Sequence, residues 1–179
     1  MIRPKDDEYA AHFRGYVTLV PEEDVLAVLQ TQMTVVQGLK ALVSEPQETF
    51  AYASGKWTVR EVIGHVCDVE RIFGFRAFAF SRSDRDALPG FDDSDYVAQA
   101  EFNATPLAEL VDDLADLRAT NLRMLRRLRG PQWDRSGIAN GRRITVRALA
   151  FVMAGHIRHH LGLLRDRYGI PVDVSRRTP

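Results

Sequence analysis

Apolar residues recur every three or four positions over four long stretches of the chain, the spacing of helices with one buried face. The first predicted helix opens at Pro21–Asp24, where a proline and three acids suit a first turn, and runs to Ser44 before Pro46. The second begins at Thr58, with Glu61 placed to complete a capping box. Its buried face consists of Val59, Val62, Val66, Val69, Phe73, Ala77 and Phe80.

The third and fourth predicted helices have equally clear start and stop signals. The third is capped by Thr105–Pro106, carries a leucine-rich face and closes at Gly130–Pro131. The fourth spans Thr145–Tyr168, with Thr145 as its N-cap and Gly169 as its stop. Its apolar face consists of Val146, Leu149, Met153, Ile157 and Leu164.

Shorter segments connect these helices. Asp6–Tyr16 has aromatic residues on one side and predicts a short amphipathic helical segment, with His12 exposed beside it. Gln47–Lys56 reads as a connection. Between Trp133 and Ile144 the pair Asn140–Gly141 is the one that a type I′ turn prefers, which predicts a small β-hairpin before the last helix.

The longest connection is polar. Asp84–Asn103 predicts a crossover with a turn at Leu88–Phe91 and one short helix around Ser94–Glu101. Four long amphipathic helices with two longer connections amount to an all-α helical bundle. We expect one domain, residues 1–179, because this length suffices for a single core.

Composition narrows the function classes. Lys and Arg total 24, as do Asp and Glu, which argues against nucleic acid or an anionic membrane as the main partner. No apolar run approaches the ~20 residues that span a bilayer, and the first ten residues show no signal-peptide core. Cys67 is the only cysteine, so no intrachain disulfide forms, and we expect a cytoplasmic protein.

Three histidines carry the candidate chemistry. His156 and His160 lie one turn apart within the apolar face of the fourth helix, and His65 lies at the edge of the buried face of the second. Buried imidazoles without partners are costly. They therefore either form hydrogen bonds in the core or share a metal ion, and the spacing alone leaves both readings open.

In the metal reading, His65, His156 and His160 supply three nitrogen ligands from facing helices. Three neutral imidazoles suit zinc, nickel, iron or copper and leave positions open for water or substrate, as catalytic sites do. Ile157 stands where a zincin peptidase of the HExxH type has its general base, which argues against that class. GxGxxG and P-loop patterns are absent, and neither Cys67 nor Ser136 has an evident His-Asp neighbour for nucleophilic catalysis.

Several neighbouring residues are secondary candidates. His159, at the edge of the apolar face near Asp166, and Asp68, one turn from His65, are the candidates for a general base. Asp68 and Glu61 also lie where a carboxylate would orient the second nitrogen of His65, although for Glu61 we favour the helix cap alone. For Arg76 we favour a snorkelling side chain or a surface ion pair over an anion-binding role.

Aromatic residues border the same region of the chain. Trp57, Phe91 and Tyr96 suit either a pocket mouth or ordinary packing. Cys67 points roughly away from His65 on the second helix, so it is a poor ligand candidate.

The motifs resemble those of the DinB-like family, over about Arg3 to Gly169. The residues that carry the resemblance are Trp57-Thr58, Gly64-His65 with Asp68, Glu70 and Arg71, then Leu88-Pro89-Gly90-Phe91-Asp92, Asn140-Gly141, and His156 with His160. The resemblance includes the YfiT-like metal-dependent hydrolases and the related thiol S-transferases. It implies a four-helix bundle in up-down-down-up order, a homodimer, and a divalent metal, zinc or nickel most readily, held by His65, His156 and His160.

Two functional hypotheses follow from the resemblance. In the first, the chain is a metal-dependent enzyme acting on a small molecule, a hydrolase if it activates water or an S-transferase if it activates a low-molecular-weight thiol. In the second, it is a non-catalytic stress-response bundle that binds a metal or small ligand. An open coordination position beside a pocket favours the enzyme, and a fourth protein ligand favours the binding module. A bundle without metal, with hydrogen-bonded histidines, is a third reading.

Overall fold

Four long helices form the body of the protein in a computed structural model that describes residues 3–83 and 86–173. Their bounds are α2 Val25–Leu42, α4 Val59–Ser81, α6 Leu107–Arg126 and α8 Val146–Tyr168. The shorter helices are α1 Arg14–Thr18, α3 Glu45–Glu48, α5 Asp93–Ala100 and α7 Gly130–Trp133, with 3₁₀ turns at Asp6–Glu8, Ala11–Phe13 and Phe102–Ala104. Strands β1 Ser136–Ala139 and β2 Arg142–Thr145 complete the fold.

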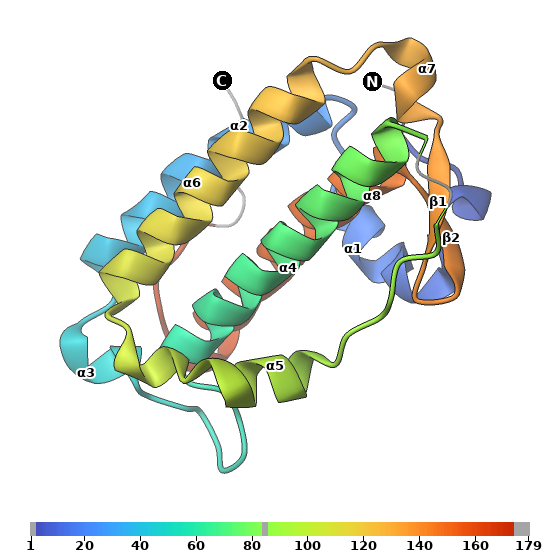
Figure 1. The fold of residues 1–179 in the computed structure, drawn as a ribbon. Coiled ribbons are helices and arrows are strands. Elements are labelled where there is room, and N and C mark those ends of the chain that lie inside the picture. The colour runs from blue at the N-terminus through green and yellow to red at the C-terminus, as the bar shows by residue number, and fades with distance from the viewer. Residues whose placement is uncertain (1–2, 84–85, 174–179) are drawn as a thin grey trace.

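The bundle has the predicted up-down-down-up order (Figure 1). α2 and α8 run in one direction, and α4 and α6 run in the other. α6 and α8 each pack against both α2 and α4, so that α4 and α8 are neighbours. Because α4 and α6 are consecutive yet parallel, a long connection carrying α5 returns along the outside of the bundle (Figure 1). Asp84, where the crossover was predicted to begin, lies outside the described residues.

The first long helix begins later than predicted. The expected first turn, Pro21–Asp24, precedes α2, because the Asp24 side chain accepts a hydrogen bond from the backbone N–H of Ala27 and is therefore the N-cap. None of these acids lies within the first turn. The prediction was wrong here because Pro21–Asp24 lies before the helix and ends at its N-cap.

Two prolines predicted to stop helices instead begin new ones. Pro46 lies in the first turn of α3, which occupies part of the expected Gln47–Lys56 connection. α6 ends at Arg126 rather than at Gly130–Pro131, and Pro131 lies in the first turn of α7. A proline lacks the N–H that the first turn leaves unpaired, so the same residue suits a start as well as a stop.

The N-terminus of α6 has no cap from its own flanking residue, and Glu48 of α3 supplies one instead. Pro106 precedes α6 and makes no side-chain cap bond. The Glu48 carboxylate accepts a hydrogen bond of 3.1 Å from the N–H of Leu107 and pairs with Arg60 of α4. One carboxylate thus joins the N-terminal end of α6 to α4.

The crossover and the hairpin pack together. α5 begins after Asp92, whose side chain accepts hydrogen bonds from the N–H groups of Ser94 and Asp95. Leu88 donates its N–H to the carbonyl of Ile138 at 2.9 Å, and its own carbonyl accepts from the N–H of Asn140 at 3.1 Å. Leu88–Phe91 is therefore not the predicted turn: the segment is extended, and Leu88 forms a parallel bridge with Ala139 that fixes the crossover to the hairpin.

The hairpin itself is confirmed. β1 and β2 pair in antiparallel register from Ser136 opposite Thr145 to Ala139 opposite Arg142. Asn140 and Gly141 have φ angles of 50° and 68°, the positive values that a type I′ turn requires at both positions. Thr145 ends β2 and then caps α8, its hydroxyl accepting from the N–H of Ala148.

The N-terminal segment is not the single amphipathic piece predicted for Asp6–Tyr16. It breaks into two 3₁₀ turns followed by α1, which lies against α8. His12 is exposed, as expected. The buried Glu8 carboxylate binds Thr145 and Arg147 at the start of α8, so this segment is held to the last helix.

A polar network crosses the apolar core. The buried Arg118 guanidinium forms two 2.9 Å contacts with the Glu70 carboxylate and donates to the Gln32 carbonyl oxygen at 2.8 Å. Gln32 in turn donates to the carbonyl of Ala154, so the network joins all four long helices. Within the described ranges, no helix has the length and apolarity needed to cross a membrane.

Candidate metal centre

Helix α4 places His65 in its second turn, on the side facing α8. The helix starts as predicted, because the Thr58 hydroxyl accepts from the N–H of Glu61 while the Glu61 carboxylate accepts from the N–H of Thr58 at 2.7 Å. Beside His65, Gly64 lies directly under the Phe102 ring, which a Cβ there would meet at 2.3 Å. Close packing on the crossover therefore fixes this turn of α4.

Helix α8 supplies the other two histidines. His156 and His160 are separated by one turn and both are buried. Gly155 allows α1 to lie directly on α8, since a Cβ at this position would be 2.0 Å from the carbonyl oxygen of Tyr16. The Tyr16 ring consequently packs edge-on against His156, with 5.3 Å between ring centroids. The N-terminal segment thus shields one side of the cluster.

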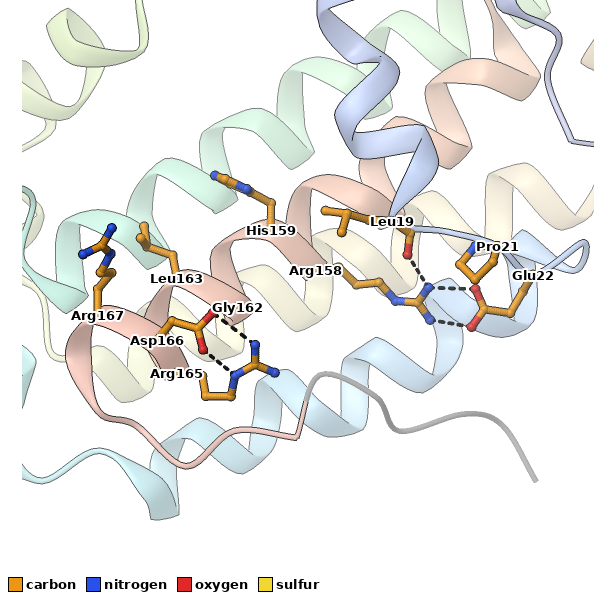
Figure 2. A pocket seen from close by; sticks show the side chains of 10 residues that line it. All are labelled: Leu19, Pro21, Glu22, Arg158, His159, Gly162, Leu163, Arg165, Asp166 and Arg167. Atoms are coloured by element: carbon orange, nitrogen blue, oxygen red, sulfur yellow. Dashed lines mark hydrogen bonds and ion pairs between the residues drawn. The ribbon is translucent and has the colours of Figure 1, made fainter.

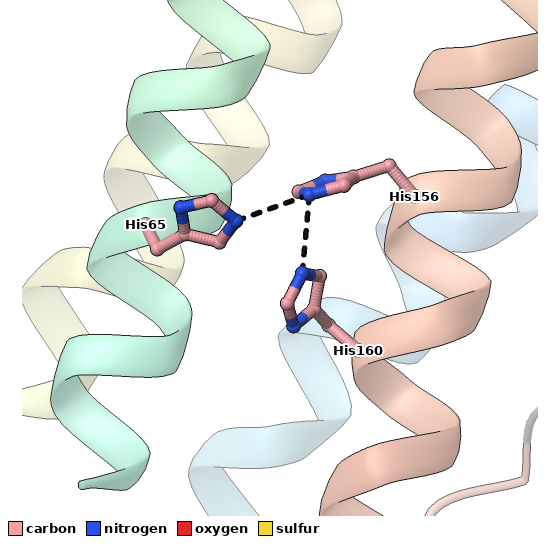
Figure 3. Close-up of side chains that lie close together, drawn as sticks. All are labelled: His65, His156 and His160. Atoms are coloured by element: carbon pink, nitrogen blue, oxygen red, sulfur yellow. Dashed lines mark hydrogen bonds between the residues drawn. The ribbon is translucent and has the colours of Figure 1, made fainter. Parts of the chain in front are cut away.

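The structure brings the three predicted histidines together (Figure 3). Nε2 of His65 and Nε2 of His160 each lie 3.1 Å from Nε2 of His156. One ring nitrogen from each residue falls within 4.8 Å of the others. Three side chains from two helices therefore point their nitrogens at a common position.

Hydrogen bonding among the rings does not account for this geometry. A neutral imidazole nitrogen carries either one hydrogen or one lone pair. His156 Nε2 therefore forms one good hydrogen bond but faces two nitrogens at bonding distance. Of the described residues, the one buried side-chain polar atom without a hydrogen-bond partner is Nδ1 of His160.

The environment keeps the rings neutral. Burial lowers the pKa of His65 to about 4, with repulsion from His159 as a further cause. Burial holds the pKa of both His156 and His160 well below the ordinary value, and the neighbouring imidazoles lower it further. Neutral imidazole is the form that coordinates metal ions, so the lone pairs are available at neutral pH.

The donor set fits a divalent transition metal. Nitrogens bound at 2.0–2.1 Å to a tetrahedral ion are about 3.3 Å apart, close to the spacing of His156 from its two neighbours. Among the described residues, the group holds no fourth His, Cys, Asp or Glu. Three imidazoles bring no negative charge and leave part of the coordination sphere open.

Asp93 places a carboxylate near Nδ1, the second ring nitrogen of His65. Its Oδ1 lies 3.8 Å from His65 Nδ1, and burial raises the pKa of Asp93. The predicted orienting residues contact other groups: Asp68 pairs with Arg71, and Glu61 serves the cap and accepts a hydrogen bond from Asn103. The sequence analysis missed Asp93 because its position near His65 depends on how the crossover folds. The sequence did contain one signal for it: Asp92 is a typical N-cap residue, which places Asp93 in the first turn of α5.

His159, the other predicted candidate base, lies beside the cluster without joining it: its ring centroid is 5.0 Å from that of His160 and 5.6 Å from that of Tyr16. It is exposed and lines a groove of about 530 Å³ formed by α8 and the chain after α1 (Figure 2). In this groove Arg158 pairs with Glu22, and Arg165 pairs with Asp166. None of the three clustered histidines lines it, so the larger hollow is separate from the candidate metal centre.

A smaller cavity, about 190 Å³, reaches the cluster at His156. Its walls come from the N-terminal segment, α4, the crossover, the hairpin and α8. The lining residues are His12, Phe13, Tyr16, Val69, Phe73, Arg76, Phe91, Asp93, Ala139, Asn140, Arg142, Arg143, Ile144, Leu149 and His156. The crossover and the hairpin therefore complete a pocket beside the open side of the centre.

The aromatic candidates have distinct positions. Phe91 lines the cavity, while Tyr96 is exposed and packs on Phe91 with 5.3 Å between centroids. Trp57 instead packs on His65, with 4.8 Å between ring centroids. Cys67 lies away from the histidines as predicted: its thiol contacts the Leu110 carbonyl, and burial raises its pKa to about 12.

The prediction for Arg76 was wrong. The side chain neither snorkels nor forms a surface ion pair, because it is buried against Phe73 and Phe91 and donates to the carbonyl of Pro89 at 2.8 Å. The crossover folds over this part of α4, and helical geometry alone could not place it. Arg76 consequently faces the cavity.

Comparisons with known proteins agree with this fold. A search of curated proteins found no match. Among solved structures, YfiT from Bacillus subtilis matches with a TM-score of 0.65 and 17% identity, over 90% of this chain and 91% of that one. YfiT is described as a probable metal-dependent hydrolase with an unusual four-helix bundle topology. At this identity the match establishes a shared fold.

The family profile covers most of the chain. The profile of the DinB superfamily matches residues 27–164, which include all three clustered histidines. The resemblance read from the motifs is confirmed by this match and by the order of the helices. The chain belongs to the DinB superfamily.

Proposed function

We propose that this protein is a metal-dependent enzyme in which His65, His156 and His160 hold a zinc or nickel ion. The observation that carries the proposal is the convergence of three neutral imidazole nitrogens, with both neighbours 3.1 Å from His156 Nε2. When bound, a divalent ion supplies Lewis acidity, which makes water or a thiol nucleophilic at neutral pH.

The surroundings support an enzyme over a non-catalytic binding module. The three-histidine group includes no fourth protein ligand from the described residues, and a cavity opens beside it. A structural zinc site would have a closed set of four ligands. The fold of YfiT, which is described as a probable metal-dependent hydrolase, adds support for the same class.

The chain's own residues orient the site and limit access to it. Asp93 attracts the proton of His65 to Nδ1, which leaves the Nε2 lone pair facing His156. Tyr16 and Phe73 pack against the ring of His156 and form the cavity wall beside it. Substrate then has access through the cavity on the crossover side.

Hydrolysis is the first candidate reaction, and S-transfer is the alternative. The chain's own thiol does not suit the second role, since Cys67 is buried, its pKa is about 12, and it contacts Leu110. An S-transferase reaction would therefore use a low-molecular-weight thiol as co-substrate. A cytoplasmic location and a homodimer remain predictions from the sequence and the resemblance.

Metal analysis of the purified chain tests the proposal. We expect about one zinc or nickel per chain, lost in His160→Ala and retained in the matched variant His159→Ala, whose side chain lies outside the group. Acidification should release the ion, because protonated imidazole does not coordinate. Stoichiometric metal in His160→Ala, or full retention near pH 4, would contradict the ligand assignment.

An activity screen then separates the two reactions. Metal-loaded protein is assayed with ester and amide substrates without thiol, and with electrophiles in the presence of common cellular thiols. Product formed without thiol identifies a hydrolase, and a strict thiol requirement identifies a transferase. Bound metal with neither activity would favour the binding module.

A further inference from the structure

Arg76 is a buried cation without a counter-ion among the described residues. Two described arginines are buried, Arg118 at 1% exposure and Arg76 at 5%. Arg118 binds the Glu70 carboxylate through two nitrogens, whereas Arg76 has one recorded hydrogen bond, to the Pro89 carbonyl. A buried charge normally requires a partner, so the contrast between the two indicates an unmet interaction at Arg76.

The unused N–H groups of Arg76 remain reachable from the cavity. A guanidinium has five N–H donors. Among the described residues, His160 Nδ1 is the one fully buried side-chain polar atom that lacks a hydrogen-bond partner. The nitrogens of Arg76 that lack a partner are therefore not fully buried. Because Arg76 lines the cavity, its free donors have access to whatever enters there.

The same cavity contains further positive charge. Arg142 and Arg143, at the start of β2, line it, and neither forms an ion pair with a carboxylate of the described residues. Arg143 instead donates to the Ser136 hydroxyl and the Asp7 carbonyl. Asp93 is the one acidic residue of the lining. This local excess occurs in a chain whose formal charges balance, with 24 basic and 24 acidic residues.

Phe73 connects the arginine to the candidate metal centre. Its ring centroid lies 5.5 Å from Cζ of Arg76 and 6.5 Å from the ring centroid of His156. Arg76 is three turns beyond His65 on α4, about 16 Å by the helical pitch, and helical side chains lean back toward the N-terminus. One molecule lying along the cavity can therefore contact both.

We propose that the substrate of this site carries a carboxylate or phosphate group that binds the guanidinium of Arg76 while its reacting bond lies at the histidine cluster. This inference rests on the proposed function and adds a substrate class to it. The planar fork of arginine matches both oxyanions through paired hydrogen bonds. The cavity of about 190 Å³ is smaller than the roughly 300–1,000 Å³ of pockets for drug-sized ligands, so it suits a small anionic molecule or the acidic end of a longer one.

The test is an NMR titration of the full chain with two probes, succinate and inorganic phosphate, and with neutral succinamide as the control. We expect saturable binding of at least one anion, with a shift of the Arg76 Nε–Hε signal, and none for succinamide. Whichever anion binds more tightly identifies the substrate group as carboxylate or phosphate. Absence of saturable binding by both anions would overturn the proposal.

Variants assign the binding to this side chain. Arg76→Met retains the aliphatic packing against Phe73 and Phe91 but should weaken binding roughly tenfold or more. Arg127→Gln removes the same charge from an exposed site at the end of α6 and should leave affinity unchanged. Arg76→Lys, which preserves the charge, should retain part of the affinity if Arg76→Met does not fold. Unchanged affinity in a folded Arg76 variant would refute the assignment.

Metal-free protein separates this inference from the proposed function. Anion binding at Arg76 should persist after the metal is removed and in His160→Ala. If binding disappears with the metal yet is unaffected by Arg76→Met, the anion binds the ion itself and the inference fails. If the chain binds no metal but anions still shift Arg76, the proposed enzyme fails while the anion site stands.

Discussion

Nε2 of His65 lies 3.1 Å from Nε2 of His156, although 91 positions separate the two residues in the sequence. The contact joins α4 to α8, two neighbouring helices whose start points are each fixed by a threonine cap. Each cap fixes the residue at which its helix begins, whereas the packing of α4 against α8 fixes which faces of the two helices meet. The approach of the two imidazoles is therefore a property of the whole bundle.

Asp93 is expected to strengthen metal binding through His65. Asp93→Asn removes the charge 3.8 Å from His65 Nδ1 and should weaken metal affinity about tenfold, the lower end of the effect of such outer carboxylates. Competition with a chromophoric chelator measures the change. Asp95→Asn, in the same turn of α5 and capped by the same Asp92, is the matched control. Equal losses in both variants would refute the orienting role.

Gly155 is expected to be required for the packing of α1 on α8. Gly155→Ala places a Cβ 2.0 Å from the Tyr16 carbonyl oxygen and should lower the free energy of unfolding by about 1–3 kcal/mol. Gly162→Ala on the same helix meets nothing within 4 Å and should instead stabilise the chain by about 0.5–1 kcal/mol. Urea unfolding compares the two. A stabilising Gly155→Ala would show that α1 does not rest on α8.

Glu8 should make stability depend on acid pH. Burial raises its pKa, but hydrogen bonds from Arg147, the Lys5 N–H and Thr145 outweigh burial and hold the pKa below its ordinary value. A depressed carboxyl pKa contributes stability above the unfolded-state value near 4.5, and this contribution is lost as the pH falls through the folded-state pKa.

Comparison with Glu8→Gln isolates this contribution. At pH 7 the variant should unfold about 1–2 kcal/mol more easily, because Thr145 and Arg147 lose a charged acceptor. The difference from the natural chain should shrink toward zero in acid. Urea denaturation at several pH values measures it, and a pH-independent difference would contradict the ionic role.

Removing one partner of the buried Arg118–Glu70 ion pair is expected to destabilise the bundle more than removing both. Glu70→Gln leaves the buried guanidinium without its counter-charge and should cost about 3–5 kcal/mol. The double variant Glu70→Leu with Arg118→Met should recover much of this loss, because no unpaired charge remains. Chemical denaturation of both variants provides the comparison. A double variant less stable than Glu70→Gln would show that the polar network itself supplies the stability.

Sequence periodicity and capping signals were sufficient for the helices that carry His65, His156 and His160. Thr58 with Glu61, and Thr145, mark helix starts by local hydrogen bonds, and the histidines follow at fixed helical angles. The Asn140–Gly141 turn was predictable for the same reason, since its φ angles depend on two residues.

The features that the sequence did not predict depend on packing between segments that are far apart in the chain. Asp93 and Arg76 meet the cavity only because the crossover folds along the bundle and binds the hairpin, which no local period encodes. Pro46 and Pro131 were ambiguous, because proline suits the start of a short helix as well as the end of a long one. The approach of α1 to Gly155 likewise joins distant segments.

The parallel order of α4 and α6 has a consequence for how such proteins diversify. The long return connection contributes Phe91 and Asp93 to the pocket wall, while all three histidines lie on α4 and α8. Replacements at Phe91 or Asp93 can therefore remodel the wall while the packing of Phe102 on Gly64 continues to hold α4 in place. Under the proposed function, changes in this connection would alter which molecules the pocket admits while the three histidines keep their positions.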